Sequence, residues 1–147
     1  MFVFKNGEVS YDSVSEMSYM EMVIEETLRM YPPLLRTDRV CNSKDGYEYN
    51  SIKMPAGQIW SVPIWALHHD SDLYPDPYRF DPERFNEANK RARESTAFLP
   101  FGAGPRMCLG MRFALIVAKI LLSVILKKYK FEKCEKTEVS VIEVYDY

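Results

Sequence analysis

Apolar residues in the first third of the chain recur every three or four positions, which is the spacing of one face of a helix. They are Met20, Val23, Ile24 and Leu28. Ser18 and Glu21 have the spacing of a capping box, which predicts that Ser18 caps this helix. Pro32 and Pro33 predict that the helix ends just before them.

Between residues 34 and 67 the pattern changes to short apolar and aromatic runs separated by turn residues. The runs DRVCNS (38–43), GYEYNSI (46–52) and QIWSVPIWAL (58–67) each predict a strand. The tripeptides KDG (44–46) and PAG (55–57) predict the turns between them, and Pro63 predicts an edge position for the last strand. The next stretch, residues 70–100, is a long connection rich in proline and aromatic residues, which predicts that it packs against the core.

A second helix is predicted from Leu109 to Lys127 and contains the most apolar stretch of the chain, FALIVAKILLSVIL at 113–126. This stretch is shorter than the roughly 20 residues of a membrane span and contains Lys119, which favours a buried core helix. Its broad apolar face consists of Leu109, Phe113, Ile116, Val117, Ile120, Leu121 and Val124, and the opposite stripe of Arg112, Lys119 and Ser123. The elements together predict an α+β fold, mainly α with small β-sheets.

Composition and charge narrow the classes of function. The 147 residues are 47% hydrophobic and 27% charged, as in an ordinary globular domain, and the net charge of −2 offers no basic surplus for nucleic acid. Three cysteines, Cys41, Cys108 and Cys134, are too few for a disulfide framework, and their odd number fits a reducing compartment. The first ten residues lack the charged start and apolar run of a secretory signal.

Cys108 lies in the segment FLPFGAGPRMCLG (98–110), directly before the second predicted helix. The dipole and free N–H groups of that helix, together with the charge of Arg106, favour a thiolate over a thiol. Three glycines, Gly102, Gly104 and Gly110, allow sharp turns and the close approach of a bulky ligand. Phe101 is expected to shield the sulfur from water, so the segment predicts a rigid, dry site for an anionic sulfur.

A lone thiolate in this setting has three chemical uses. A nucleophile needs a nearby base, and nothing in the sequence ties His68 or His69, the two histidines, to Cys108. Zinc needs about four ligands, usually paired at short spacing, which the cysteines and histidines do not show. A haem iron needs one axial thiolate and cations for the propionates, a role that suits Arg106. Cysteines before helices are also commonly core residues, so the residues alone leave these alternatives open.

The segment resembles the cysteine-ligand loop of the cytochrome P450 haem-thiolate monooxygenases. The pattern F-x-x-G-x-R-x-C-x-G is met at Phe101, Gly104, Arg106, Cys108 and Gly110, which arises by chance in a chain of this length with odds on the order of 10⁻⁵. ETLR supplies the family's E-x-x-R at Glu26 and Arg29, a spacing that alone indicates only a common helical ion pair. DPERF resembles the family's meander signature and supplies Arg84. In the family these three charges form a buried structural triad that locks the cysteine loop.

The resemblance covers about residues 13 to 135 and implies the C-terminal part of the P450 fold, so residues 1–147 are expected to form the haem-binding portion of an incomplete P450-like domain. The chain looks most like the microsomal branch that oxidises drugs, steroids and plant toxins. Arg39 then falls at a second propionate-binding position beside Arg106, and Leu34 and Leu35 fall at the substrate pocket, although ordinary core packing also explains the leucines. His68 matches the family's H-R-D pattern, and His69 stands where arginine is usual.

The resemblance implies a haem b monooxygenase with Cys108 as catalytic residue and axial iron ligand, which inserts one atom of O₂ into a small apolar substrate. Electrons are expected from an NADPH-dependent reductase, for which Arg112 and Lys119 are candidate docking residues or simply a solvated stripe. The full-length type belongs on the cytoplasmic face of the endoplasmic reticulum membrane, whereas this chain alone, with no membrane segment and no nucleic-acid partner, is expected in the cytoplasm. The family's A-G-x-x-T helix, membrane anchor and final hairpin are missing from the sequence. The alternative is therefore a non-catalytic truncated fragment that binds haem weakly or not at all, and we expect the chain alone to be inactive.

Overall fold

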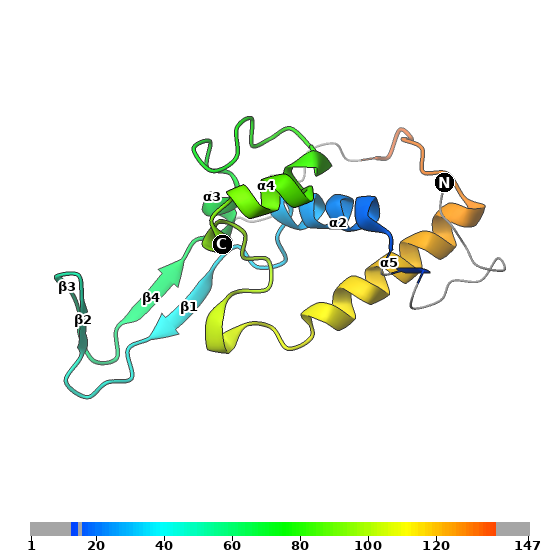
Figure 1. Ribbon diagram of the computed structural model, residues 1–147. Helices are drawn as coiled ribbons and strands as arrows, with labels where there is room; N and C mark the ends of the chain where they lie inside the picture. The colour runs from blue at the N-terminus through cyan, green and yellow to red at the C-terminus, as the bar shows by residue number, and fades with distance from the viewer. Residues whose placement is uncertain (1–12, 15, 138–147) are drawn as a thin grey trace.

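The computed structural model describes residues 13–14 and 16–137, which form helices and two small antiparallel sheets (Figure 1). The α-helices are α2 (Ser18–Met30), α3 (Ile64–His68), α4 (Glu87–Ala92) and α5 (Met111–Lys128), and the 3₁₀ turns are η2 (Pro82–Phe85), η3 (Ser95–Ala97) and η4 (Gly104–Arg106). The strands are β1 (Thr37–Val40), β2 (Tyr47–Tyr49), β3 (Ile52–Met54) and β4 (Ile59–Val62). The predicted α+β class, mainly helical with small sheets, is confirmed. Among the described helices, each is too short or too polar to cross a bilayer.

The strands form two separate antiparallel pairs, β1 with β4 and β2 with β3, which extend away from the helices in Figure 1. The prediction of one continuous strand over 46–52 is wrong, because Asn50 and Ser51 have φ values of 47° and 65° and reverse the chain between β2 and β3. The strand predicted to run to residue 67 ends at Val62. Pro63 follows it with a φ of −80° and serves as the N-cap of α3, in keeping with the preference of proline for helix starts.

Helix α2 begins at Ser18, but the predicted capping box does not form. Met17 is the N-cap and makes no side-chain capping bond. A capping side chain belongs to the residue just before the helix, from which it reaches the free N–H groups of the first turn. Ser18 is already the first helical residue, so its hydroxyl is not in that position. At the other end, the Tyr31 N–H donates to the Thr27 carbonyl at 2.8 Å, and Pro32 follows as predicted.

One cluster of the described core lies where α2 packs on α5. Three buried residues of the α2 region pack against three half-buried residues of α5: Met17, Met20 and Ile24 against Leu115, Ala118 and Leu122. Two polar residues of α5 are buried in the same interface, Lys119 at 6% and Ser123 at 1% exposure. Lys119 Nζ donates to Glu21 Oε2 at 2.6 Å, and Ser123 Oγ donates to the Lys119 carbonyl at 2.6 Å.

The orientation of α5 therefore corrects the prediction from its pattern. The broad apolar face was expected in the core, yet Phe113 is 74% exposed and Leu121 56% exposed, while Lys119 is buried. The stripe that faces α2 pairs Lys119 with Glu21 and packs Leu115, Ala118 and Leu122 against the buried residues of the α2 region. The hydrophobicity of the α5 faces alone therefore did not predict which of them meets α2.

The connection between α3 and the cysteine segment is packed and locally ordered. Tyr74 and Phe85 are buried, as the aromatic content predicts, whereas Tyr78 and Phe80 are exposed. Its short helices carry their own caps. Asp81 Oδ1 accepts from the Glu83 N–H at 3.1 Å at the start of η2, and Asn86 Oδ1 accepts from the Asn89 N–H at 2.9 Å at the start of α4.

Candidate functional site

Cys108 lies in a loop whose backbone is closed on itself. The Cys108 N–H donates to the Phe101 carbonyl at 2.9 Å, and inside this closure the Met107 N–H donates to the Gly104 carbonyl at 3.0 Å. Gly102 and Gly104 have φ values of 73° and 70°, a region that favours glycine, so both glycines are required for this path of the backbone. The loop therefore holds the sulfur on a fixed backbone.

The surroundings of the sulfur are more open than the sequence predicted. Cys108 is exposed, Phe101 is half-buried, and α5 begins at Met111, two residues later than expected, because Leu109 and Gly110 form a turn. Leu109 is fully exposed. The expected dry pocket is thus absent from the part of the chain that the structure describes, because no described side chain covers the thiol.

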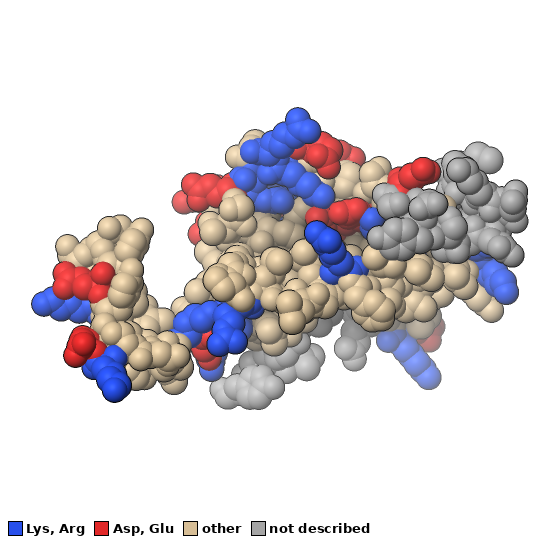
Figure 2. Space-filling model, turned by 60° about the horizontal axis from the view of Figure 1, so that its bottom comes forward, with Lys and Arg blue, Asp and Glu red and all other residues tan. Residues whose placement is uncertain are grey.

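Space for a large group is available along the loop. A Cβ placed at Gly102 or Gly104 would meet no atom within 4 Å, and one at Gly110 would lie 3.8 Å from Cys108 Sγ. Leu109 and Phe113, which follow the loop in the chain, are both exposed. Figure 2 shows that the charged side chains on the side of the molecule turned forward there lie in separate groups, with uncharged surface between them. Exposed apolar surface next to a fixed thiol fits a bulky, flat, apolar ligand.

The two arginines expected near the propionates lie on different elements. Arg106 ends η4, two residues before Cys108, and its side chain is exposed with no ion pair or hydrogen bond to the described residues. Arg39 lies on β1 and donates through Nη1 to Thr37 Oγ1 and to the Asp38 carbonyl, both at 2.8 Å. Neither guanidinium has a carboxylate partner among residues 13–14 and 16–137, so both charges are available to an anion.

The three expected triad residues come together at the buried face of α2. Arg29 Nε and Nη2 donate to Glu26 Oε2 and Oε1 at 2.7 and 2.9 Å, and both side chains are 0% exposed. Arg84 Nε lies 3.5 Å from Glu26 Oε1, an ion-pair distance that lacks hydrogen-bond geometry. The Asp81 N–H also donates to Glu26 Oε1 at 2.9 Å. The triad thereby ties the 76–84 segment to α2.

Arg29 holds two further segments through backbone carbonyls. Its Nη1 donates to the His68 carbonyl and its Nη2 to the Pro77 carbonyl, each at 2.7 Å. The buried guanidinium of Arg29 thus donates to Glu26 and to both carbonyls. It acts as a junction between α2, α3 and the connection that follows α3.

Sequence reasoning did not predict the second buried group next to this junction, which contains His68 and Tyr74. His68 is 0% exposed and contacts both the Arg29 carbonyl and the Leu99 N–H, and Tyr74 is 2% exposed with its hydroxyl donating to the Ala97 carbonyl at 2.9 Å. Burial raises the pKa of Tyr74 and lowers the pKa of His68 to about 4. The aromatic content of the connection and the match of His68 to the H-R-D pattern were the sequence signals for these residues, and neither predicted that they are buried together.

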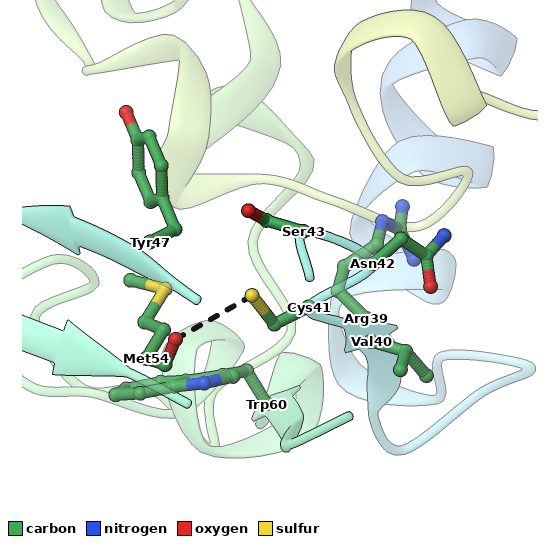
Figure 3. Close-up of a pocket in the computed structure, with 8 residues that line it drawn as sticks. All are labelled: Arg39, Val40, Cys41, Asn42, Ser43, Tyr47, Met54 and Trp60. Atoms are coloured by element: carbon green, nitrogen blue, oxygen red, sulfur yellow. Dashed lines mark hydrogen bonds between the residues drawn. The ribbon is translucent and has the colours of Figure 1, made fainter. Parts of the chain in front are cut away.

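Two of the cavities in the described part of the chain are candidates for a ligand, and Cys108 lines neither of them. The first, of about 450 Å³, lies between the two hairpins, with Cys41 Sγ near the Met54 carbonyl and the charged end of Arg39 on the side away from Tyr47 (Figure 3). The second, of about 520 Å³, lies beside η2 and α4. Leu34 and Leu35 line neither cavity. Leu34 is 61% exposed, which argues against core packing for that residue.

The candidate docking residues for a reductase separate in the structure. Arg112 is exposed on the first turn of α5, whereas Lys119 is buried and paired with Glu21. Lys119 therefore cannot contribute to a docking face, and that prediction is corrected. In residues 13–14 and 16–137 no three or more His, Cys, Asp and Glu side chains cluster as a metal cage.

Comparison with known proteins gives a single family. The family model described as Cytochrome P450 matches residues 2–144. The chain is 45% identical over 130 residues to Cytochrome P450 3A31 of Mesocricetus auratus, which covers 88% of this chain and 26% of that protein. It is also 45% identical to Cytochrome P450 3A1 of Rattus norvegicus, over 88% of this chain and 25% of that protein, and 42% identical to Cytochrome P450 3A29 of Sus scrofa, over the same shares. The chain thus spans about a quarter of the length of these relatives.

Proposed function

The chain belongs to the cytochrome P450 family, and on that premise we propose that it is the haem-binding part of a haem-thiolate monooxygenase, with Cys108 as the axial ligand of the iron. The observation that carries this proposal is the geometry of the cysteine loop. Its backbone is closed by the bond from the Cys108 N–H to the Phe101 carbonyl, its thiol is exposed, and open space adjoins Gly102 and Gly104.

The donor set of this region fits a porphyrin iron better than a metal held by side chains alone. Haem iron takes four nitrogens from the macrocycle and needs one axial ligand from the protein, which a single thiolate supplies. Zinc would need about four side-chain ligands, and the described residues form no such cluster. The exposed Leu109 and Phe113 would supply apolar contact to the macrocycle.

Arg106 and Arg39, which have no carboxylate partner among the described residues, are the candidates for the haem propionates. Arg106 is two residues from the thiol, and Arg39 comes from β1, so the pair would hold the macrocycle from two separate elements. A guanidinium binds a carboxylate through two parallel hydrogen bonds, which fixes its orientation as well as its charge. Gly104 and Gly110 would keep the loop backbone free of side chains near the macrocycle.

When bound through a thiolate, haem supplies the activation of O₂ with two electrons, so that one oxygen atom enters a substrate and the other leaves as water. The chain's own residues hold and tune this site. As the iron ligand, the Cys108 thiolate would donate electron density to the metal, and the triad of Glu26, Arg29 and Arg84 fixes the 76–84 segment against α2. The electrons come from NADPH through a reductase, for which Arg112 remains a docking candidate.

The substrate is a small apolar molecule, and Leu34 and Leu35 are the residues of this chain expected to face it. The full-length protein is expected to act on the cytoplasmic face of the endoplasmic reticulum membrane. The exposed apolar face of α5, which includes Phe113 and Leu121, favours one alternative. In that alternative, the chain by itself binds haem weakly or not at all and does not complete the oxygenation.

The test is the spectrum of the reduced carbon monoxide complex of the full chain loaded with haem. A thiolate ligand gives a strongly red-shifted band, and we expect this band for the wild type and for the matched controls Cys41→Ala and Cys134→Ala. Cys108→Ala should abolish it. A band typical of imidazole ligation, or a thiolate band that survives Cys108→Ala, would contradict the proposal, and a wild type that takes up no haem would favour the alternative.

A further inference from the structure

His68 is buried at the point where three segments meet. Its Nε2 lies 2.9 Å from the Leu99 nitrogen, and its Nδ1 lies 3.2 Å from the Arg29 carbonyl oxygen. An amide N–H only donates, so Nε2 must be the unprotonated acceptor, and the proton on Nδ1 must be donated to the Arg29 carbonyl. The two contacts thus require one neutral tautomer of the imidazole.

The same residue is held in place from its own backbone and from its ring faces. Arg29 Nη1 donates to the His68 carbonyl at 2.7 Å, so the triad arginine and the histidine bind each other's main chain. The imidazole stacks on Phe98, with ring centroids 5.3 Å apart and an interplanar angle of 30°. Tyr74 fixes the same segment through its bond to the Ala97 carbonyl.

Residues 97–99 lead directly into the cysteine loop. The Gly102 N–H donates to the Leu99 carbonyl at 3.1 Å, and the Cys108 N–H donates to the Phe101 carbonyl at 2.9 Å. A continuous path of short contacts therefore runs from Arg29 through His68 and Leu99 to the loop that carries the thiol.

We propose that His68 is a positioning residue for Cys108, because its neutral imidazole ties the start of the 98–108 loop to the buried triad on α2. The part of this inference that concerns the iron rests on the function proposed above. The part that concerns the loop does not, because it is carried by contacts within this chain.

Burial, assisted by nearby charges, keeps the imidazole of His68 neutral. Arg29 faces it from α2, Arg93 comes from the end of α4, and the titratable His69 follows it directly as the C-cap of α3. Tyr74 contributes the edge of its ring at a centroid distance of 6.5 Å, and the 97–99 segment contributes no charge. Burial is the largest cause that lowers the pKa of His68 to about 4. The hydrogen bond to the Arg29 carbonyl opposes this shift, and the charges of Arg29 and Arg93 add to it, so the acceptor for the Leu99 N–H persists at neutral pH.

Two variants separate the two hydrogen bonds of the ring. In His68→Gln the side-chain oxygen reaches the place of Nε2 and keeps an acceptor for Leu99, whereas in His68→Asn the amide replaces Nδ1 and leaves Leu99 without one. His69→Gln is the matched control, since His69 bonds the Trp65 carbonyl and stacks on the Trp65 ring, and it makes no hydrogen bond or ring contact with residues 98–108 of the described chain. The measurement is amide hydrogen exchange at Leu99 in the full chain, relative to exchange in an unstructured peptide.

At pH 7 we expect Leu99 to exchange about tenfold faster in His68→Asn than in the wild type, the factor that corresponds to one lost hydrogen bond. His68→Gln and the His69→Gln control should stay near the wild type. As the pH falls from about 6.5 towards 4, the wild type should lose protection at Leu99 while His68→Gln keeps it, because only the imidazole takes up a proton there. This difference in pH profile is one that a merely space-filling residue would not produce.

The inference is overturned if His68→Asn protects Leu99 as well as the wild type does, or if the wild type and His68→Gln share one pH profile. Should His68→Asn fail to fold, the comparison of the wild type with His68→Gln decides alone. The exchange pattern does not depend on haem, so a chain that binds no haem would refute the proposed function and leave this result intact. If haem binds through Cys108, His68→Asn should show a smaller fraction of the thiolate band than His68→Gln.

Discussion

Replacement of Arg29 by methionine is expected to remove a large share of the free energy of unfolding. Arg29 donates twice to Glu26 and once each to the His68 and Pro77 carbonyls. Methionine fills much of the same space but leaves Glu26, which is 0% exposed, with only the Asp81 N–H and the distant Arg84 Nε as partners. The variant therefore buries a carboxylate that has lost its main partner.

The magnitude follows from these lost contacts. Stranding one member of a buried ion pair costs about 3–5 kcal/mol, and the two carbonyls that lose their donor bring the expected total to about 5 kcal/mol. Ordinary domains are stable by about 5–15 kcal/mol, so this loss is a third of the total or more. With a slope of about 2 kcal/mol per molar urea, the midpoint of unfolding should fall by about 2–3 M, or helical circular dichroism should already be lost in buffer.

Two controls make the experiment specific to the buried charge. The double variant Glu26→Gln/Arg29→Met removes both charges and should be more stable than Arg29→Met alone, since no carboxylate is left unpaired. Arg91→Met breaks a pair to Glu87 at 4.0 Å in which both side chains are more than 80% exposed, and it should leave the midpoint unchanged. A midpoint for Arg29→Met within about 0.5 M of the wild type would refute this reasoning, and so would a double variant less stable than the single one.

Three further outcomes are expected. Between pH 6.5 and about 4 the wild type should lose about 3 kcal/mol of unfolding free energy relative to His68→Gln. The reason is that the pKa of His68 is lowered to about 4 in the folded state, so the unfolded state binds the proton first as the pH falls. Urea titrations at the two pH values in which both proteins lose the same stability would contradict this. In urea titration, Glu21→Gln should destabilise the fold more than Lys119→Met does. The Lys119 side chain is 8% exposed and that of Glu21 is 35% exposed, so only the loss of Glu21 leaves a buried charge without its partner. Equal effects of the two variants would argue against a buried lysine. Gly46→Ala should lower the midpoint of thermal unfolding more than Gly57→Ala does. Both glycines have a φ of 76°, but only at Gly46 would the added Cβ lie 2.7 Å from a backbone carbonyl oxygen, that of Met54. A reversed order of the two midpoints would be inconsistent with these turns.

The sequence predicted the elements of this fold better than their orientation. The helical periods gave α2 and α5 nearly in place, and the alternation of aromatic runs with turn residues gave the strand region. The pattern failed for α5, where Lys119 is buried and Phe113 exposed, because periodicity ranks the faces of a helix by their own hydrophobicity and contains no information about a partner such as Glu21. The turn at Asn50 and Ser51 was missed because it lacks glycine, the usual signal for a left-handed turn.

The candidate site divides in the same way. A short motif brought Cys108, Phe101 and the glycines to attention, since their relation is local and is set by the backbone of one loop. Glu26 and Arg29 are one helical turn apart, so their pairing also follows from local spacing. The contact of His68 with Leu99 spans 31 residues and depends on how α3 packs against α2, which no local pattern expresses.

The central claim is that the Cys108 sulfur ligates a haem iron, and X-ray absorption at the iron edge of the haem-loaded full chain tests it most directly. The account predicts one sulfur scatterer in the first coordination shell of the wild type and none in Cys108→Ser. A first shell of nitrogen and oxygen alone in the wild type, or a sulfur that remains in Cys108→Ser, would contradict the account.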